Sequence, residues 1–262
     1  MPQIEFRILG PLQLGHGHHM IIKSPRQQVV LAALLLNPNR PVPVESLTNA
    51  VWEGTPPEGA RHQLQNCAWM LRRRIRDLGM SGAEITASPA GYAIHVDECR
   101  LDVTLFERQL AESRRLAASG RLAQASQQIK AALSLWQGPP LSGVPGRVMR
   151  REAAGLAERR LSAQEDWIDL EMALGRGSQV TADLYRLVAE QPFRERLRAQ
   201  LMIALHASGR TAEALATYRQ ARRLFVDELG LEPGPVLKGV ERGILQGGAA
   251  LRPAGLPYAF GT

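Results

Sequence analysis

Hydrophobic and polar positions alternate along the first 22 residues, which is the pattern of short β-strands. The apolar positions are Ile4, Phe6, Ile8, Leu12, Leu14 and the run from Met20 to Ile22. Gly10-Pro11 and the GHGHH segment supply turn sequences between them. The pattern predicts three or four short antiparallel strands at the amino terminus.

The pattern changes to a helical one at SPRQ, residues 24–27. Ser24 can cap a helix, Pro25 suits the first turn, and Gln27 completes a capping box. The following run QVVLAALLLN is apolar on most sides, so this helix is predicted to be buried. A short second helix is predicted to end at Trp52, and the segment EGTPPEG, residues 53–59, is predicted to be a loop.

A third helix is predicted from about Ala60 to Leu78, before Gly79. At about 100° per residue, one face collects an apolar stripe. Its members are Ala60, Leu64, Cys67, Ala68, Leu71, Ile75 and Leu78. The opposite face then carries His62, Asn66, Trp69, Arg73 and Asp77. Arg72 and Arg74 fall on the two flanks, with Gln63 beside Arg74.

Two alternating runs follow, EITA from Glu84 and YAIHV from Tyr92, joined by the turn sequence SPAG. Strands, three helices and a hairpin, in that order, predict a winged helix-turn-helix that ends near Asp97.

From Asp102, which can serve as an N-cap, the sequence pattern predicts helices. Segments beginning ASGR at Ala118 and Ala207 resemble each other, and a weaker copy starts at Gly175. Gly175 and Gly209 are 34 residues apart, which is the tetratricopeptide period. Small or apolar residues recur 5, 9 and 12 positions after each repeat glycine: Ala125, Ile129, Ala132; Val180, Leu184, Leu187; Ala214, Tyr218, Ala221. A generic helical bundle is the alternative.

The predicted fold is therefore mainly α with a small amino-terminal β-sheet. We expect a winged helix-turn-helix domain over residues 1–97 and an α-helical, tetratricopeptide-like domain over 98–245. The Gly/Ala/Pro-rich segment 246–262 is predicted to be disordered.

Charge adds a candidate nucleic-acid surface to this picture. The formal net charge is +7, from 32 basic and 25 acidic residues. Between residues 59 and 82, the only acidic residue is Asp77, against five arginines: Arg61, Arg72, Arg73, Arg74 and Arg76.

The amino terminus has no apolar signal segment, and no run of apolar residues is long enough to span a membrane. Cys67 and Cys99 show neither disulfide-framework nor metal spacing, so a reducing, cytoplasmic setting is expected.

Catalytic motifs are not found. GHGHHM lacks the third glycine of a dinucleotide fingerprint, and His16, His18 and His19 have no carboxylate or cysteine at ligand spacing. There is no P-loop and no G-x-S-x-G elbow. We therefore expect neither an enzyme, nor a metal, nor a cofactor.

The third helix fits a major groove, with its outer line facing base edges and its flanks facing phosphates. His62, Gln63 and Asn66 lie near its amino-terminal end and are the best candidates for base readout, together with Trp69 and Arg73. Arg26, Arg61, Arg72, Arg74 and Arg76 are candidates for phosphate contact. Trp69 could touch thymine methyls or sugar, or instead pack under the hairpin. The alternative for the whole face is ordinary solvated surface.

The two halves together resemble the Streptomyces antibiotic regulatory protein family, in which an OmpR-type winged helix precedes a bacterial transcriptional activation domain. In the first half the resemblance rests on QQVVLAALLL, LTNAVWEGTPP, ARHQLQ, LRRRIR and GYAIHVD. In the second half it rests on LDVTLF, LWQGPPL, PFRERLRAQLMIALHASGRTAEALATY and ELGLEP. It covers the chain from Phe6 to about Leu245.

The resemblance implies an activator of secondary-metabolite gene clusters, including those for antibiotics. Such proteins bind direct repeats near the promoter −35 element as side-by-side homodimers and recruit RNA polymerase holoenzyme through its sigma factor. By this analogy the loop residues Glu53, Gly54, Thr55, Pro56, Pro57 and Glu58 are the candidate polymerase contact. Ser88 and Tyr92 at the hairpin are candidates for phosphate or minor-groove contact. The resemblance also implies that the protein is associated with the nucleoid.

This sequence departs from the family at Trp69 and Met70, where relatives often have a small polar residue and an arginine, so a different target sequence is expected. Neither a receiver domain nor an ATPase module is expected. The competing hypothesis is a helical-repeat adaptor or ligand-sensing module whose winged helix binds protein.

Overall fold

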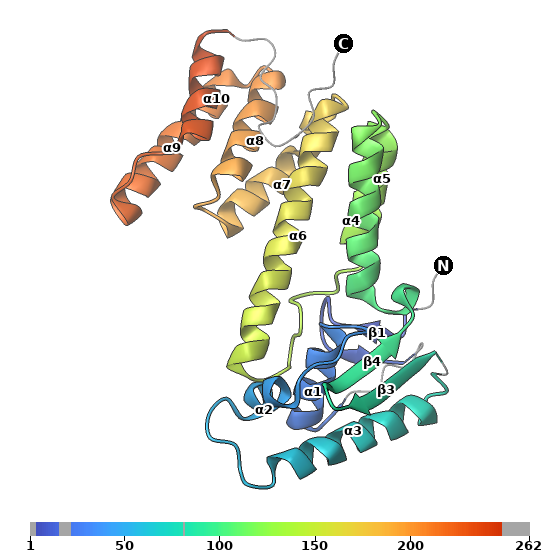
Figure 1. The fold of residues 1–262 in the computed structure, drawn as a ribbon. Coiled ribbons are helices and arrows are strands. Elements are labelled where there is room, and N and C mark those ends of the chain that lie inside the picture. The colour runs from blue at the N-terminus through green and yellow to red at the C-terminus, as the bar shows by residue number, and fades with distance from the viewer. Residues whose placement is uncertain (1–3, 16–21, 81, 248–262) are drawn as a thin grey trace. The chain divides into compact units, whose positions relative to one another are not determined.

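A computed structural model describes residues 4–15, 22–80 and 82–247 (Figure 1). The chain divides into two compact units. The first contains residues 1–111 and 131–160, and the second contains 112–130 and 161–262. Three helices pass from one unit to the other: α4 (Asp102–Ala118), α5 (Leu122–Leu133) and α6 (Arg147–Ala173).

The first unit contains the three helices that were predicted before the hairpin: α1 (Pro25–Leu35), α2 (Val44–Trp52) and α3 (Ala60–Asp77). Most of α1 is buried, as its apolar sequence predicts. Ser24 is the N-cap residue of α1, but its side chain makes no capping hydrogen bond, and Gln27 is buried. The predicted capping box is therefore wrong, while Pro25 occupies the first turn as expected.

The hairpin is confirmed. Strands β3 (Ala83–Ser88) and β4 (Gly91–Val96) pair antiparallel, with Ser88 opposite Gly91. Gly91 has φ +129°, and a Cβ there would lie 2.0 Å from the Val42 carbonyl oxygen. Only glycine fits this position. The close approach lets Val42 and Tyr92 exchange two backbone hydrogen bonds, of 2.7 and 3.0 Å, which fix the hairpin to the start of α2.

The amino-terminal strands are fewer than predicted in the part of the chain that the structure describes. They are β1 (Phe6–Arg7) and β2 (Gln13–Leu14), paired antiparallel. Met20 and Ile21, like His16, His18 and His19, lie outside the described residues. Ile8 and Leu9 are fully buried but are not part of a strand. Their backbone groups form hydrogen bonds with residues outside β1 and β2.

Those partners come from distant segments of the same unit. The Asp102 carboxylate accepts hydrogen bonds from the backbone N–H groups of Ile8 and Leu9, at 3.0 and 2.9 Å. The Ile8 and Leu9 carbonyls accept from the N–H groups of Leu141 and Gln137. The short 3₁₀ turn η1 (Glu98–Arg100) leads into α4, whose first residue is Asp102.

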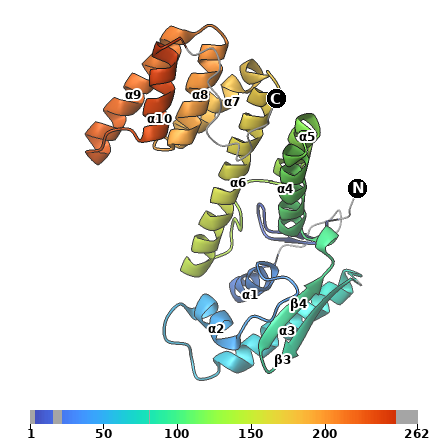
Figure 2. The same cartoon turned by 45° about the horizontal axis from the view of Figure 1, so that its top comes forward.

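The second unit contains α7 (Gly177–Glu190), α8 (Glu195–Ala207), α9 (Thr211–Leu229) and α10 (Pro235–Leu245). Helix α8 packs against α7, α9 and α10, as both ribbon views show (Figures 1 and 2). All nine residues at the predicted repeat positions are buried: Ala125, Ile129, Ala132, Val180, Leu184, Leu187, Ala214, Tyr218 and Ala221. The three repeat glycines have φ of 74–76°, so each makes the left-handed turn between helices.

A buried ionic cluster lies between the second half of α6 and the start of α8. Glu165 and Asp169 are each 1% exposed. Arg194 pairs with Glu165 at 2.9 Å, and Arg196 pairs with Asp169 at 2.6 Å. Burial raises the pKa of Asp169, and the hydrogen bond from Arg196 opposes that rise.

In the described ranges, no helix is both long and apolar enough to cross a bilayer.

Candidate nucleic-acid interface

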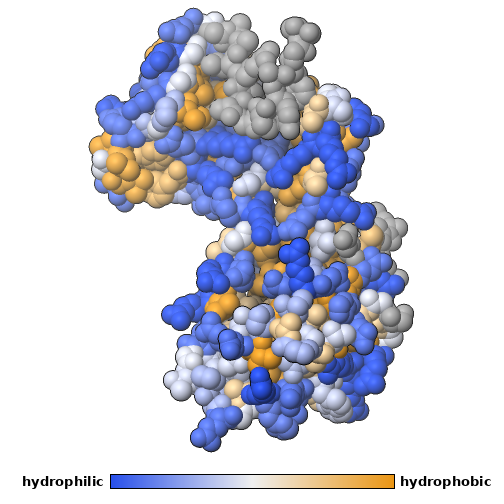
Figure 3. Space-filling view, viewed as in Figure 1, coloured by the Kyte–Doolittle hydropathy of each residue, from blue (hydrophilic) through white to orange (hydrophobic). Residues whose placement is uncertain are grey.

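Helix α3 buries one face and exposes the opposite one, as its periodicity predicts. Ala60, Leu64, Cys67, Ala68, Leu71 and Ile75 are buried, and Leu78 just beyond the helix is half-buried. The predicted outer residues His62, Asn66, Trp69, Arg73 and Asp77 are all exposed. In Figure 1 the helix lies at the outer edge of the first unit, beside β3. Figure 3 shows mainly hydrophilic residues over this lower region.

Two of the predicted contact residues interact with each other at the amino-terminal end of α3. The Arg26 guanidinium donates a 2.6 Å hydrogen bond from Nη1 to Oε1 of Gln63. The same guanidinium lies 5.7 Å from the centre of the Trp52 ring. Gln63 is half-buried and Arg26 is exposed. The two side chains thus hold each other at the surface where α1 and α3 begin.

The three consecutive arginines have three different environments. Arg72 is half-buried, and its Nε donates a 2.6 Å hydrogen bond to the Ile85 carbonyl of β3. Arg73 is exposed and lies 3.7 Å from Asp77, one turn away. Arg74 is half-buried. Arg72 therefore connects α3 to the hairpin, a role that the sequence pattern did not reveal. Arg61 and Arg76 are exposed.

Trp69 is the largest exposed apolar side chain of α3. It is 51% exposed, and the Arg73 guanidinium lies 5.9 Å from its ring centre. It is therefore not buried beneath the hairpin, which was one of the two expectations. An aromatic ring with a cation beside it, held on an outward helical face, is suited to contact apolar and anionic groups together.

The hairpin places its two candidate residues differently. Ser88 is exposed, and its Oγ accepts a 3.2 Å hydrogen bond from the Ala90 N–H, which shapes the turn. Tyr92 is only 8% exposed. The Tyr92 side chain is therefore part of the core of the first unit, while Ser88 remains accessible.

The loop after α2 is anchored at one end. Glu53 has φ +51°, and its Oε1 accepts hydrogen bonds from the backbone N–H groups of Arg147 and Val148, the first residues of α6. The residue before α6 is Gly146, which has no side chain to cap the helix. The Glu53 carboxylate supplies the acceptor that Gly146 lacks. Residues 54–58 are exposed.

Comparison with known proteins gives consistent results for both halves of the chain. The model of the bacterial transcriptional activator domain matches residues 101–245. "Regulatory protein DnrI" of Streptomyces peucetius is 35% identical over 253 residues, covering 93% of this chain and 92% of DnrI. "Regulatory protein AfsR" of Streptomyces griseus is 37% identical, with 97% of this chain and 26% of AfsR covered.

A mycobacterial regulator extends the comparison to a solved structure. "Transcriptional regulatory protein EmbR" of Mycobacterium tuberculosis is 35% identical over 247 residues, covering 93% of this chain. The structure of EmbR in complex with a low-affinity phosphopeptide matches with a TM-score of 0.88 over 94% of this chain. The chain spans 64% of EmbR's length.

The fold class predicted from the sequence is confirmed: a winged helix followed by a tetratricopeptide-like helical domain. The domain model covers more than half of the chain, and DnrI is matched over nearly its whole length. On this evidence the chain belongs to the Streptomyces antibiotic regulatory protein family.

Proposed function

We propose that this protein is a sequence-specific DNA-binding transcriptional activator of a secondary-metabolite gene cluster. The observation that carries the proposal is the exposed face of α3, where His62, Asn66, Trp69 and Arg73 stand opposite a fully packed stripe. A helix presented in this way, with polar and cationic side chains outward, suits the width of the DNA major groove. The names of its relatives, all regulatory proteins, support the same function.

The proposed contacts divide into two classes. His62, Gln63, Asn66, Trp69 and Arg73 face base edges, and Arg26, Arg61, Arg72, Arg74, Arg76 and Ser88 face the backbone. Tyr92 acts through the hairpin's position rather than by direct contact, since its side chain is buried. The DNA-binding part is proposed to be residues 1–97 and the activation part 98–245.

The experiment is titration of the protein with promoter DNA at increasing salt. Footprinting on the promoters of neighbouring genes first supplies the DNA. Because bound cations are released when arginines neutralise phosphates, log affinity falls with log salt with a slope of about −0.9 per phosphate. We expect a slope that corresponds to several phosphates. Binding that is absent, or independent of salt, would contradict the proposal.

The remaining features of the proposal concern partners and place. Two copies bind direct repeats near the −35 element side by side, in the cytoplasm and on the nucleoid.

The exposed loop residues 54–58 contact RNA polymerase holoenzyme, whereas the Glu53 carboxylate is already hydrogen-bonded to the start of α6. Substitution of Thr55 and Glu58 should then lower transcription in a purified system and leave DNA affinity unchanged. A parallel loss of DNA affinity would remove the loop from polymerase contact.

A further inference from the structure

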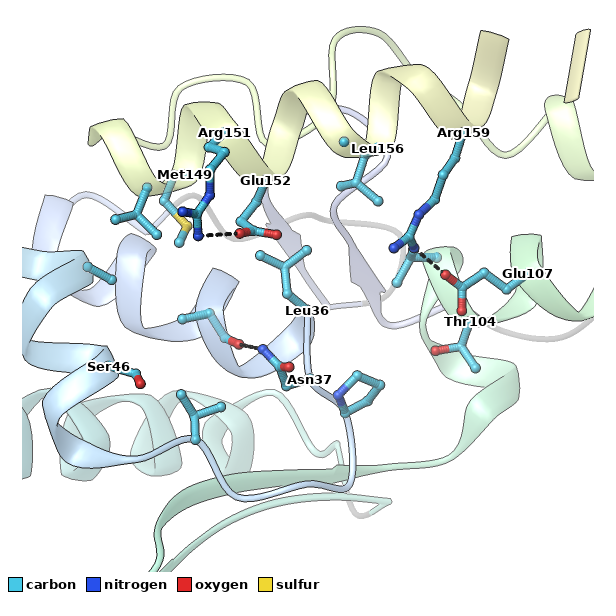
Figure 4. A pocket seen from close by; sticks show the side chains of 17 residues that line it. Leu36, Asn37, Ser46, Thr104, Glu107, Met149, Arg151, Glu152, Leu156 and Arg159 are labelled. Atoms are coloured by element: carbon cyan, nitrogen blue, oxygen red, sulfur yellow. Dashed lines mark hydrogen bonds and ion pairs between the residues drawn. The ribbon is translucent and has the colours of Figure 1, made fainter. Parts of the chain in front are cut away.

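The depression between α1, α2, α4 and α6 is matched by side chains of the first unit itself (Figure 4). Its apolar residues Met149 and Leu156 are buried, and Arg159 of α6 pairs with Glu107 of α4. The second unit, by contrast, exposes large apolar side chains.

These apolar side chains gather at one end of the second unit. They come from the loop before α8, the last turn of α9, the loop after it and the first turn of α10. Each is between 42% and 62% exposed. In Figure 3, hydrophobic residues cover α9 at the left of the view. We call this surface the α9 patch, and its members are Phe193, Val226, Leu229, Leu231 and Val236.

The α9 patch is built around the buried ring of Phe225. The Phe193 ring lies 6.0 Å from it, and the buried Arg198 guanidinium lies 5.9 Å from it. Gly230 ends α9 with φ +68°, and the Leu231 N–H then donates a 3.2 Å hydrogen bond to the Phe225 carbonyl. Phe193 and Leu231 are therefore both held at the end of α9.

The remaining members adjoin the same end. Val226 and Leu229 are three residues apart, so they are neighbours on the helix surface. The Glu195 carboxylate accepts a 2.8 Å hydrogen bond from the Gly234 N–H, which fixes the start of α10, and with it Val236, to the start of α8. Single exposed apolar residues are common, but a group of them in one place marks an interaction surface.

The spacing along α9 indicates that the missing partner is a helix. Ala214, Tyr218, Ala221 and Phe225 form the buried stripe of α9, and Leu229 continues it at the same spacing but is half exposed. In a helical repeat, each helix buries its stripe against the next helix. Leu229 therefore lies where one more helix would pack.

Acidic residues in the last turn of α9 indicate the charge of that helix. Asp227 and Glu228 are exposed, and within the described ranges neither forms an ion pair, although Arg223 is one turn from Asp227. Carboxylates are unfavourable at this end of a helix, where the dipole is negative. Arg222 does not compensate them, because Glu232 holds its guanidinium at 2.6 and 2.8 Å. The α9 patch thus has a negative border on a chain whose net charge is +7.

We propose that the α9 patch binds a basic amphipathic helix of a partner protein. The apolar face of that helix packs on Phe193, Leu229 and Leu231, and its Lys or Arg side chains face Asp227 and Glu228. Removal of apolar side chains from water stabilises the complex, and the opposite charges select the partner. The proposal concerns a protein partner and does not rest on DNA binding.

The test uses two fluorescent peptides of about 14 residues, or four helical turns. One has leucines on one helical face and lysines on the other, and the second has glutamates in place of the lysines. We expect the full chain to bind the leucine–lysine peptide at least about ten-fold more tightly. Non-specific attraction would give the opposite preference, because the chain as a whole is positive.

Leu229→Ser combined with Leu231→Ser should weaken binding of the leucine–lysine peptide at least about ten-fold. Phe193→Ser is a second disrupting variant, and Leu245→Ser, which changes an exposed leucine at the other end of α10, is the matched control and should have no effect. Asp227→Asn combined with Glu228→Gln should weaken binding about three- to ten-fold without lowering the midpoint of unfolding. The unfolding transition of every variant is measured to exclude misfolding.

Three results would overturn the proposal. The first is equal or tighter binding of the leucine–glutamate peptide. The second is unchanged binding of the leucine–lysine peptide to both disrupting variants in their folded state. The third, measured by sedimentation, is a dimer of the natural chain that the peptide does not displace and that the two leucine substitutions abolish, because a second copy would then occupy the α9 patch.

Discussion

The Glu53 carboxylate accepts a 3.0 Å hydrogen bond from the backbone N–H of Val148 and a second from that of Arg147. A residue of the loop between α2 and α3 thus caps a helix that begins 94 residues later. A carboxylate at this end of a helix also meets the positive end of the helix dipole. The arrangement ties the proposed polymerase loop to the activator domain's longest helix.

Glu53→Ala should lower the free energy of unfolding by about 1 kcal/mol, because loss of an N-capping side chain costs about 0.5–2 kcal/mol. Urea denaturation measures the change. Glu58→Ala, in the exposed part of the same loop, is the matched control and should have no effect. Equal stability of the two variants would show that the cap contributes nothing.

Asn66→Ala should weaken binding to cognate DNA by about 1–3 kcal/mol and change binding to random DNA little, because a base contact is lost. Arg76→Ala, which removes an exposed charge on the same helix, should weaken both alike. Fluorescence anisotropy on the two DNAs measures the ratio. Identical ratios for both variants would reject the division of α3 into base and phosphate faces.

Arg72→Ala should differ from Arg76→Ala in stability as well as in DNA affinity. It removes the hydrogen bond to the Ile85 carbonyl, and such bonds contribute about 1 kcal/mol. We expect weaker binding to all DNA together with a lower denaturation midpoint. A variant with unchanged midpoint would mean that the bond to the hairpin is replaced by water without cost.

Asp102 predicts a specific pH dependence. Burial raises its pKa from 3.8 to about 6, although the N–H groups of Ile8, Leu9 and Val103 act in the opposite direction. The folded state therefore holds the proton more tightly than the unfolded state, and stability is lost as pH rises from about 4 to about 6. At about 1.4 kcal/mol per pKa unit, the loss is about 3 kcal/mol.

Denaturation of the natural chain and of Asp102→Asn at several pH values isolates this contribution. The stability of the natural chain relative to the variant should fall between pH 4 and 6 and be constant above pH 7. A relative stability that rises across this interval would mean that the three N–H donors outweigh burial.

Arg196→Met should destabilise the second unit by about 3–5 kcal/mol, since it leaves the buried carboxylate of Asp169 without its cation. Arg186→Met is the control, because Arg186 pairs with Asp183 and Glu190 on an exposed helical surface, where such pairs contribute about 0–1 kcal/mol. Thermal unfolding measures the stability loss of each variant. Equal losses would show that the buried ion pair of Arg196 contributes no more to stability than the exposed pairs of Arg186.

Local periodicity was sufficient to predict the faces of α3, the hairpin at Ser88 and the buried repeat positions. Each of these depends on residues close in sequence, where helical or strand geometry determines which side chains share a face. The contacts of Glu53, Asp102 and Arg72 could not be predicted in this way. They join a side chain to the backbone of another element, and no local pattern marks the acceptor or donor. The supposed capping box at Ser24 failed for the related reason that Gln27 is buried against the core.

The hydrogen bonds of Ile8 and Leu9 also bear on how the protein can be divided. Residues 1–97 contain every proposed DNA contact, yet the amino-terminal segment is completed by Asp102, Gln137 and Leu141. A fragment that ends at residue 97 would keep α3 but leave buried N–H and carbonyl groups of the amino terminus unsatisfied. The shortest segment that contains the proposed DNA contacts is consequently shorter than the segment that satisfies the backbone of the amino terminus.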